Sequence, residues 1–420
     1  MSTTLLKGPL IVTQNANRQI FRGNLLYEDG VVAYVGPDSP EADEVIDFSG
    51  KMICPGFINT HTHVAMTHLR GLLDDIPLSD FLARTSELDS QRTSKGIYNS
   101  ALLGAFEMAS SGVTTFLDLY YSEDVIAEAT SKVGIRGYLA WATLDDDKTT
   151  QKGSPIINAR GFLNNTKRTD LVNPCVGVQG VYAASDDVYM SAKELADKYG
   201  TLIHTHLAET REEVYAFKKE RGVRPAEHLH RIGVTGRNFV AAHGVWLTKN
   251  EVRMLASDSS SISWNPASNA KLGVGGVAQV PEMMGMGLNV TLGSDSAGSN
   301  NSQDVTSGMK LGSLMLKNER WDPSVLKAQH LLDMATVNGA KALMNDAIGS
   351  LEIGKSADIV AFDINSPYIF PVTAKTAVQS IVYGNSIGAI SDVICRGKFV
   401  KRNGKLAGFD PEYFQGCEFV

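Results

Sequence analysis

The chain has 420 residues, of which 43% are hydrophobic and 20% charged, so it has the composition of a globular protein with ample core for one large domain or two ordinary ones. Its 46 acidic side chains outnumber its 39 basic ones and give a net charge of -7, which leaves no basic field to attract nucleic acid or an anionic membrane. The four cysteines form no Cys-x-x-Cys pair, the N-terminus lacks the apolar run of a signal peptide, and no apolar segment reaches about 18 residues, so we expect a cytoplasmic protein with small-molecule partners.

The N-terminal region, residues 8–53, has the pattern of short strands separated by turns. Apolar runs at residues 24–27 and 31–35 flank Glu28-Asp29-Gly30, and a hairpin is predicted there because Gly tolerates the positive φ of a tight turn. A further run covers residues 9–13. About fifty residues of β structure cannot bury a two-layer core alone, so we expect this region to pair with another part of the chain.

From Ile53 onward, short apolar strands alternate with stretches of helical periodicity. The predicted strands cover residues 53–59, 113–119, 136–140, 175–178, 202–206, 239–243, 261–264 and 289–292. Helices are predicted between most of them, for example at residues 97–110, 186–199, 212–221 and 249–256. Eight strands alternating with helices are what a (β/α)8 barrel requires, whereas an open, doubly wound sheet is disfavoured because no Gly-x-Gly-x-x-Gly follows the first strand.

The C-terminal region returns to strand character. After a helical stretch at residues 323–344, apolar runs follow at residues 357–362 and 393–400, and Arg402-Asn403-Gly404 predicts another hairpin turn. Two small β regions at opposite ends of a barrel can pair with each other. The predicted fold class is therefore α/β: a (β/α)8 TIM barrel over residues 55–349, with a small composite β-sandwich built from the N- and C-terminal segments, residues 1–54 and 350–420.

Polar side chains that suit a metal ion follow several of the predicted barrel strands. His61 and His63 end the first strand, and residues i and i+2 of a strand face the same side, although an isolated His-x-His is more often a half-buried pair. His206 ends the fifth strand, His243 ends the sixth, and Asp295 follows the eighth. Because the C-terminal ends of barrel strands form one mouth, all five side chains are expected to meet there. Three histidines and an aspartate suit Zn²⁺ or Fe²⁺ and leave a position open for water.

Two further residues lie beside His206 in the segment His204-Thr205-His206-Leu207-Ala208-Glu209. The carboxylate of Glu209, three residues beyond His206, could move protons between a metal-bound water and a substrate nitrogen. His204 points the same way as His206 but lies one layer deeper in the barrel, where side chains fill the interior. We interpret His204 as a packing residue or a support for the ligands rather than as a ligand.

Six motifs spread over residues 55–301 occur together in one known family. They are Pro55-Gly56-Phe57-Ile58-Asn59-Thr60-His61-Thr62-His63, Arg70-Gly71 with Asp74-Asp75, His206-Leu207-Ala208-Glu209-Thr210, Ala241-Ala242-His243-Gly244-Val245, Asn265-Pro266-Ala267-Ser268-Asn269, and Gly293-Ser294-Asp295 with Ser299-Asn300-Asn301. On these motifs the chain resembles the amidohydrolase superfamily, in particular its metal-dependent deaminases and chlorohydrolases, the group that includes methylthioadenosine and S-adenosylhomocysteine deaminases. As a set the motifs are specific for the superfamily and much less so for the substrate.

The resemblance implies one divalent metal ion, expected to be Zn²⁺, although the same ligands accept Fe²⁺. The implied ligands are His61, His63, His206 and Asp295. Glu209 becomes the general acid/base, and His243 moves from a ligand to a hydrogen-bonding group near the attacking water or the leaving group. Asp295 would take a proton from the water while Glu209 protonates a ring nitrogen, so the expected reaction is metal-assisted hydrolytic deamination.

The chain departs from the family pattern where the substrate would bind. Adenosine-type members carry Pro-His-Ala-Pro-Tyr after the fourth strand, and Gln179 replaces that His; it is either a pocket residue, as its place at a strand end favours, or a solvent-facing Gln. The family's ribose-binding Glu falls at Glu87 or Asp89. Trp264 replaces a family His and is either a stacking wall or core. Ser299 completes the expected substrate contacts.

The leading hypothesis is hydrolytic deamination of methylthioadenosine, 5'-deoxyadenosine or adenosine, with release of ammonia. S-adenosylhomocysteine is less expected, because Arg136 and Arg160 are only nearby candidates for the arginines that grip its carboxylate. The alternative is a deaminase or chlorohydrolase of a free heterocycle of guanine, cytosine, pterin or triazine type, which Gln179 would suit. A non-catalytic protein that kept the barrel is disfavoured, because every ligand position and Glu209 are present. We also expect a homo-oligomer, since large barrels often pair.

Overall fold

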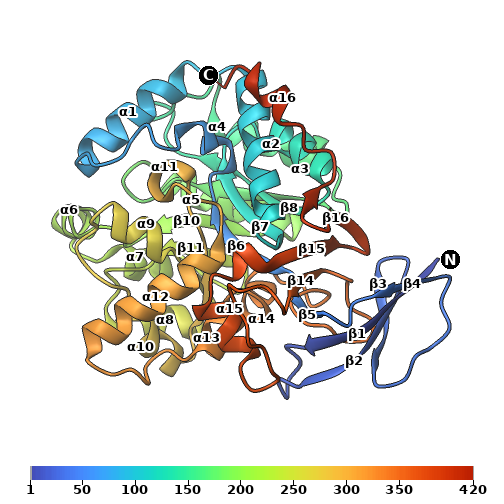
Figure 1. Cartoon of the computed structure of the whole chain (residues 1–420). Coiled ribbons are helices and arrows are strands. Elements are labelled where there is room, and N and C mark those ends of the chain that lie inside the picture. Colours follow the sequence, from blue (N-terminus) through green and yellow to red (C-terminus); the bar gives the residue numbers. More distant parts are fainter. Residues whose placement is uncertain (1, 420) are drawn as a thin grey trace.

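The computed structural model describes residues 2–419 and divides the chain between two sheets (Figure 1). One is an eight-stranded parallel barrel surrounded by helices, and the other is a nine-stranded sheet made by the two ends of the chain. In Figure 1 the blue N-terminal strands lie to the lower right of the barrel, and the orange and red strands β14 and β15 lie between them and the barrel. The barrel predicted from the alternation of strands and helices is confirmed.

The barrel strands are short, almost entirely buried and parallel to their neighbours. In chain order they are β6 (Phe57–Thr62), β7 (Val113–Tyr120), β8 (Arg136–Thr143), β9 (Val172–Val178), β10 (Ile203–Leu207), β11 (Phe239–His243), β12 (Ser261–Trp264) and β13 (Asn289–Leu292). Strands that are covered on both faces read as continuous apolar runs, which is why the sequence predicted them. The last three have the predicted bounds.

The helices cover the outside of the barrel (Figure 1). They are η1 (Val64–Leu69), α1 (Leu78–Ser90), α2 (Ser94–Ser110), α3 (Glu123–Val133), α4 (Pro155–Asn165), α5 (Asp186–Tyr199), α6 (Arg211–Arg221), α7 (Pro225–Arg231), α8 (Lys249–Ser257), α9 (Pro266–Lys271), α10 (Val280–Gly285), α11 (Ala297–Asn300), α12 (Val305–Arg320), α13 (Ala328–Met334), α14 (Val337–Ala342), α15 (Ala377–Tyr383), η2 (Ser386–Ala389) and α16 (Pro411–Gln415). Threonine side chains cap α2, α6 and α8 at their first turns. Across residues 2–419, none of these helices is long and apolar enough to cross a membrane.

The second sheet joins strands from both ends of the chain. The N-terminal part contributes β1 (Thr3–Val12), β2 (Ile20–Glu28), β3 (Val31–Gly36), β4 (Glu44–Asp47) and β5 (Lys51–Pro55), and the C-terminal part contributes β14 (Ile359–Asp363), β15 (Ile390–Cys395), β16 (Lys398–Arg402) and β17 (Lys405–Leu406). The hydrogen-bonded order is β17-β16-β15-β14-β5-β1-β2-β3, with β4 also paired to β1. The two ends meet at β5, which pairs with β14 on one side and β1 on the other. The hairpin predicted at Glu28-Asp29-Gly30 joins β2 to β3.

The single strand predicted over residues 53–59 is wrong, because the chain changes sheets in the middle of it. β5 ends at Pro55 in the nine-stranded sheet, and β6 begins at Phe57 in the barrel. Gly56 donates its N–H to the carbonyl of Asp358 at 2.9 Å, and a Cβ at this position would lie 2.1 Å from Oγ1 of Thr114. Only glycine permits so close an approach, and the apolar residues on both sides hide the break from periodicity.

The strand predicted over residues 393–400 is also wrong, because the chain reverses within it. β15 ends at Cys395 and β16 begins at Lys398, and the turn residues Arg396 and Gly397 have φ of 51° and 73°. The turn predicted at Arg402-Asn403-Gly404 joins β16 to β17 as expected. The helical stretch predicted over residues 323–344 consists of two short helices, α13 and α14.

The barrel closes where β6 meets β13. Oγ1 of Thr60 lies 2.6 Å from Oγ1 of Thr291 and donates to the carbonyl of Leu292 at 3.0 Å. The backbone N–H of Asp295 donates to the carbonyl of His61 at 2.9 Å. Asp295 has φ of 64°, a left-handed conformation that non-glycine residues seldom adopt. The closure therefore holds Asp295 in a strained backbone beside His61.

A buried ion pair joins the opposite end of the barrel to the nine-stranded sheet. Arg136 is the first residue of β8, and its Nη1 lies 2.6 Å from Oδ2 of Asp358, with the two side chains only 5% and 4% exposed. The other oxygen of Asp358 accepts the hydroxyl of Ser356 and the backbone N–H of Arg396, each at 2.8 Å. Arg136 is thus a structural residue at the N-terminal end of its strand, far from the mouth that would hold a substrate.

Asp358→Ala is expected to lower the free energy of unfolding by about 3–5 kcal/mol, because it leaves the Arg136 guanidinium buried without its partner. Chemical denaturation followed by circular dichroism measures this change. Asp147→Ala is the matched control, since Asp147 pairs with Lys148 at 3.7 Å on the surface and its loss should change stability by no more than about 0.5 kcal/mol. Equal stability of the two variants would contradict the structural role of the buried pair.

Candidate metal centre

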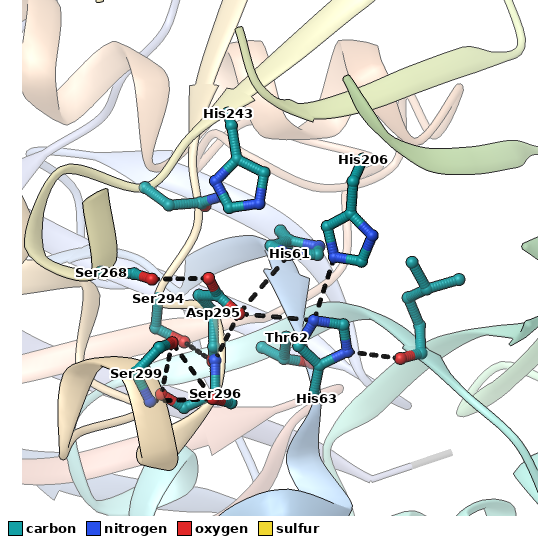
Figure 2. A network of polar contacts seen from close by, with 12 residues as sticks. His61, Thr62, His63, His206, His243, Ser268, Ser294, Asp295, Ser296 and Ser299 are labelled. Atoms are coloured by element: carbon teal, nitrogen blue, oxygen red, sulfur yellow. Dashed lines mark hydrogen bonds and ion pairs between the residues drawn. The ribbon is translucent and has the colours of Figure 1, made fainter. Parts of the chain in front are cut away.

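Three imidazoles and a carboxylate meet at the C-terminal mouth of the barrel (Figure 2). His61 and His63 come from the end of β6, His206 comes from β10, and Asp295 follows β13. One ring nitrogen from each of these three histidines lies within 4.8 Å of the others, and so do donor atoms of His61, His243 and Asp295. The structure thus brings together the five side chains that the strand ends predicted would meet, and all five are buried.

His63 and His206 turn unprotonated nitrogens toward each other. Nδ1 of His63 lies 2.5 Å from the carbonyl oxygen of Leu119, and Nδ1 of His206 lies 2.5 Å from that of Gln179. Because a carbonyl only accepts, each Nδ1 carries the ring proton and each Nε2 carries a lone pair. The two Nε2 atoms lie 3.2 Å apart. A dashed line joins the two rings in Figure 2. Two facing lone pairs are favourable only with a positive charge between them.

His61 lies deepest in the cluster. Its Nε2 is 3.7 Å from Oδ1 of Asp295 and, among residues 2–419, has no hydrogen-bond partner although it is buried. Its Nδ1 lies 2.8 Å from Nε2 of His204. Burial, followed by the neighbouring histidines, lowers the pKa of His61 well below its ordinary value. A buried nitrogen without a partner is unfavourable, and a metal ion at the centre of the cluster would satisfy it.

Asp295 supplies the negative charge of the cluster. Its Oδ1 lies 3.4 Å from Nε2 of His63 and accepts the backbone N–H of Ser296 at 2.7 Å, while its Oδ2 accepts the hydroxyl of Ser268 at 2.6 Å. Burial alone would raise the pKa of Asp295, but His63, His243 and the Ser268 hydroxyl hold it below its ordinary value. The group is therefore a carboxylate at neutral pH, ready to bind a cation.

This donor set fits a divalent metal ion. Three imidazole nitrogens and one carboxylate oxygen are usual zinc ligands, and four protein donors of this kind also accept Fe²⁺. Burial is the main cause that lowers the pKa of His206 to about 4, which disfavours a proton on this ring at neutral pH, and a metal cation between His206 and His63 would satisfy both lone pairs. The unpartnered Nε2 of His61 points to the same conclusion.

His243 differs from the other three histidines at the mouth in carrying its ring proton on the nitrogen that faces the site. Its Nδ1 faces the side-chain amide nitrogens of Asn269 at 2.9 Å and Asn265 at 3.2 Å. Accepting a hydrogen bond at Nδ1 leaves the ring proton on Nε2, which lies 3.7 Å from Oε2 of Glu209. His243 therefore offers a donor to the mouth, whereas His63 and His206 offer lone pairs.

Glu209 is the candidate proton donor at the mouth. Burial, followed by the negative charges of Asp295 and Glu213, raises the pKa of Glu209 well above its ordinary value. The carboxylate of Glu213 accepts the backbone N–H groups of Ala208 and Glu209, each at 2.9 Å, and so fixes the turn after β10. A neutral carboxylic acid beside three imidazoles can donate a proton to a bound molecule.

Gln179 lies at the mouth, as its place after β9 predicted. Its carbonyl holds His206, and its side-chain Nε2 lies 3.3 Å from the hydroxyl of Tyr182. Tyr182 is half exposed, and Glu209 is among the charges that act on its hydroxyl. Tyr182 was not predicted as a site residue, although it stands only three residues after Gln179.

Of the two candidates for the ribose contact, the structure brings Asp89 toward the site and leaves Glu87 exposed on α1. Asp89 accepts a hydrogen bond from the hydroxyl of Tyr120, and its backbone carbonyl accepts the hydroxyl of Tyr121 at 3.0 Å. Burial raises the pKa of Asp89, while the hydrogen bond from Tyr120 and the nearby Arg92 oppose this shift. Tyr120 and Tyr121 were missed because aromatic residues at the end of a buried strand read as core.

Trp264 packs away from the mouth, and its predicted role as a substrate contact is corrected, whereas the predicted contact of Ser299 stays a prediction. Trp264 is 1% exposed, and a Cβ added to Gly312 of α12 would lie 2.5 Å from its ring, so it packs between the barrel and that helix. Ser299 is 2% exposed, and its backbone N–H and hydroxyl both bond to Ser296. Ser299 therefore stabilises α11, the short helix that follows Asp295.

Similarity to known proteins extends over almost the whole chain. A model of the amidohydrolase family matches residues 52–400. A 5'-deoxyadenosine deaminase from Methanobrevibacter smithii is 35% identical over 98% of this chain and 95% of its own length. A 5-methylthioadenosine/S-adenosylhomocysteine deaminase from Pyrococcus furiosus is 35% identical over 94% of each chain. Among solved structures, an adenosine deaminase from Xanthomonas campestris with bound zinc has a TM-score of 0.93 at 25% identity, and the match covers 98% of this chain and 96% of that one.

The purified chain is expected to hold one zinc or iron ion, and His206→Ala is expected to lose it, because the variant removes one of the three inward-facing lone pairs. Inductively coupled plasma mass spectrometry measures the metal content. His228→Ala is the control, since His228 bonds to Asp186 at 2.8 Å outside the cluster. Equal metal content in the two variants would contradict the assignment of the centre.

Proposed function

The chain belongs to the amidohydrolase family, and we propose that it removes the amino group of a 5'-modified adenosine by hydrolysis, with one zinc ion as its cofactor. Hydrolytic deamination of an adenosine-like nucleoside is supported by relatives named for that reaction, which match nearly the whole chain. The observation that carries the proposal is a cluster of inward-facing imidazole nitrogens and one carboxylate, with Oε2 of Glu209 lying 3.7 Å from Nε2 of His243 at its edge. Such a set combines a water-activating centre with a proton donor for a ring nitrogen.

The residues proposed to hold the zinc ion are His61, His63, His206 and Asp295. When bound, the ion lowers the pKa of a coordinated water toward about 7, so that a nucleophile is available at neutral pH. Zinc is preferred to iron because the adenosine deaminase of similar fold contains bound zinc.

Glu209 is proposed to make the substrate carbon electrophilic. In adenine the amino group sits on C6, which is bonded to ring nitrogen N1. Transfer of the Glu209 carboxyl proton to N1 draws electrons away from C6 and prepares it for attack by the water oxygen. The raised pKa of Glu209 keeps this proton in place at neutral pH until the substrate nitrogen arrives.

Asp295 and His243 are proposed to serve the oxygen and the leaving group. Asp295, which is held as a carboxylate, accepts a proton from the attacking water and passes it to the amino group, which leaves as ammonia. His243 donates its Nε2–H to the oxygen that becomes the C6 carbonyl. Of the two water protons, one ends on ammonia and the other replaces the proton that Glu209 gave to N1, so the product is a lactam.

Asp89 and Gln179 are proposed to select the substrate. A carboxylate such as Asp89 can accept both ribose hydroxyls, and the amide of Gln179 can donate and accept at either the sugar or the base. Arg136 lies at the other end of the barrel, bound to Asp358, so it does not serve a homocysteine carboxylate. Small neutral 5'-groups, as in 5'-deoxyadenosine and methylthioadenosine, are therefore favoured over S-adenosylhomocysteine.

Self-association and a cytoplasmic location stay predictions.

Glu209→Gln is expected to lower kcat for deamination by about 10²–10⁴-fold while metal content stays the same, because an amide has no proton to transfer. Wild-type kcat should fall on the alkaline side, since the acid form of Glu209 is present below its raised pKa and is lost as the pH rises through it. Coupled detection of ammonia measures both effects. Glu212→Gln makes the same substitution on an exposed residue of α6 and should keep wild-type kcat; wild-type kcat in Glu209→Gln would refute the acid role.

Asp89→Asn is expected to raise KM for 5'-deoxyadenosine by about 10- to 100-fold, because hydrogen bonds to a carboxylate contribute about 1.5–3 kcal/mol. Glu87→Gln is the matched control and should leave KM unchanged. The same ammonia assay run on adenine, guanine and cytosine separates the free-heterocycle alternative. Release of ammonia from free bases, with none from any 5'-modified adenosine, would reject the nucleoside assignment.

A further inference from the structure

His204 lies inside the barrel beneath the candidate metal centre. It faces the interior from β10, two residues before His206, and is fully buried. Its Nε2 lies 2.8 Å from Nδ1 of His61, and its Nδ1 lies 2.8 Å from the carbonyl oxygen of Val240 on β11. Because β6 and β10 are four positions apart in the eight-stranded order, the contact between the two imidazoles crosses the barrel interior.

The hydrogen-bond partners determine which nitrogen carries the proton on each ring. The carbonyl of Val240 only accepts, so Nδ1 of His204 is a donor. A second proton on Nε2 would make His204 a buried cation with no carboxylate hydrogen-bonded to it in the described part of the chain, which is strongly unfavourable. Nε2 of His204 therefore accepts, Nδ1 of His61 donates, and Nε2 of His61 keeps a lone pair directed at the centre.

In His61, as in His63 and His206, Nδ1 carries the proton and Nε2 the lone pair, but the group that accepts the Nδ1 hydrogen bond differs. His63 and His206 donate their Nδ1 protons directly to carbonyls of neighbouring strands. The Nδ1 of His61 instead faces across the barrel, where the acceptor is the ring of His204. Without that acceptor, the buried Nδ1–H of His61 would have no hydrogen-bond partner. Moving the proton to Nε2 or turning the ring would then be favourable, and either change removes a lone pair from the centre.

We propose that His204 is a positioning residue, which holds the orientation and the proton of His61 so that Nε2 of His61 is free to bind the metal ion. The inference rests on the metal site of the proposed function and deepens it. Partners of this kind, which accept the second N–H of a metal-binding histidine, typically change metal affinity by about 10- to 100-fold when they are removed. His204 would therefore affect how tightly the chain binds the metal ion, and this affinity can be measured apart from catalysis.

The test compares His204→Met with His204→Gln, two side chains of similar size and flexibility of which only Gln offers a strong acceptor to His61. Zinc-loaded wild type and variants are mixed with excess chelator, and zinc loss is followed with a colorimetric indicator. His204→Met should bind zinc about 10- to 100-fold more weakly than wild type, and His204→Gln should recover part of this loss. The visible spectrum of the Co²⁺-substituted chain should change in the Met variant, as expected for a displaced ligand.

Thr205→Val is the matched control. Thr205 lies between His204 and His206 on the same strand, but its hydroxyl contacts that of Tyr189 at 3.0 Å and the backbone carbonyl of His206 at 3.2 Å, and it forms no hydrogen bond with an imidazole ring. This variant should lower Tm and keep wild-type zinc affinity. If His204→Met does not fold, His204→Phe replaces it as the variant without an acceptor.

Wild-type zinc affinity in the variant without an acceptor, or equal losses in that variant, His204→Gln and Thr205→Val, would overturn the inference. A wild-type chain that retains zinc but releases no ammonia from nucleosides would overturn the proposed function and leave the role of His204 intact. A wild-type chain that binds no zinc would overturn both.

Discussion

Two imidazole nitrogens, Nε2 of His63 and Nε2 of His206, face each other at 3.2 Å with their ring protons already bonded elsewhere, and this contact requires a positive charge. Burial lowers the pKa of His206 to about 4, which disfavours a proton on that ring, and a metal cation would meet the requirement. The same burial, helped by nearby carboxylates, raises the pKa of Glu209. Burial thus has two effects at this site: it favours neutral imidazoles whose lone pairs can bind a cation, and it favours the acid form of the neighbouring Glu209.

The closure of the barrel and the construction of the site depend on the same residues. The hydrogen bond from Asp295 to the carbonyl of His61 joins the last strand to the first, and it places a carboxylate next to two imidazoles. Asp295 and His243 both have positive φ, 64° and 78°, in a conformation that the surrounding sheet must enforce. The rigid barrel therefore enforces the strained backbone that orients the side chains of Asp295 and His243. The hydrogen bond from His204 across the barrel interior orients the ring of His61.

The sequence predicted the barrel and the members of the metal cluster because both follow strand ends, and buried parallel strands are continuous apolar runs that end in polar residues. It missed the change of sheet at Gly56 and the reversal at Arg396-Gly397, because apolar residues continue on both sides of each break. The sequence could not decide whether Asp89 or Glu87 faces the site, or whether Trp264 is a core or a pocket residue. Both choices depend on which face of a helix or strand is turned toward the mouth. The bond between His204 and His61 depends on a distance across the barrel that no spacing in the chain encodes.

The central claim is that a single metal ion among His61, His63, His206 and Asp295 makes this chain a nucleoside deaminase. The most direct measurement is a titration of the metal-free chain with Zn²⁺, in which the ultraviolet absorbance of 5'-deoxyadenosine reports conversion of its base. We expect no deamination without metal and a linear gain in activity that saturates at one zinc ion per chain. Full activity in the metal-free chain, or a gain that continues to a second equivalent of zinc, would contradict it.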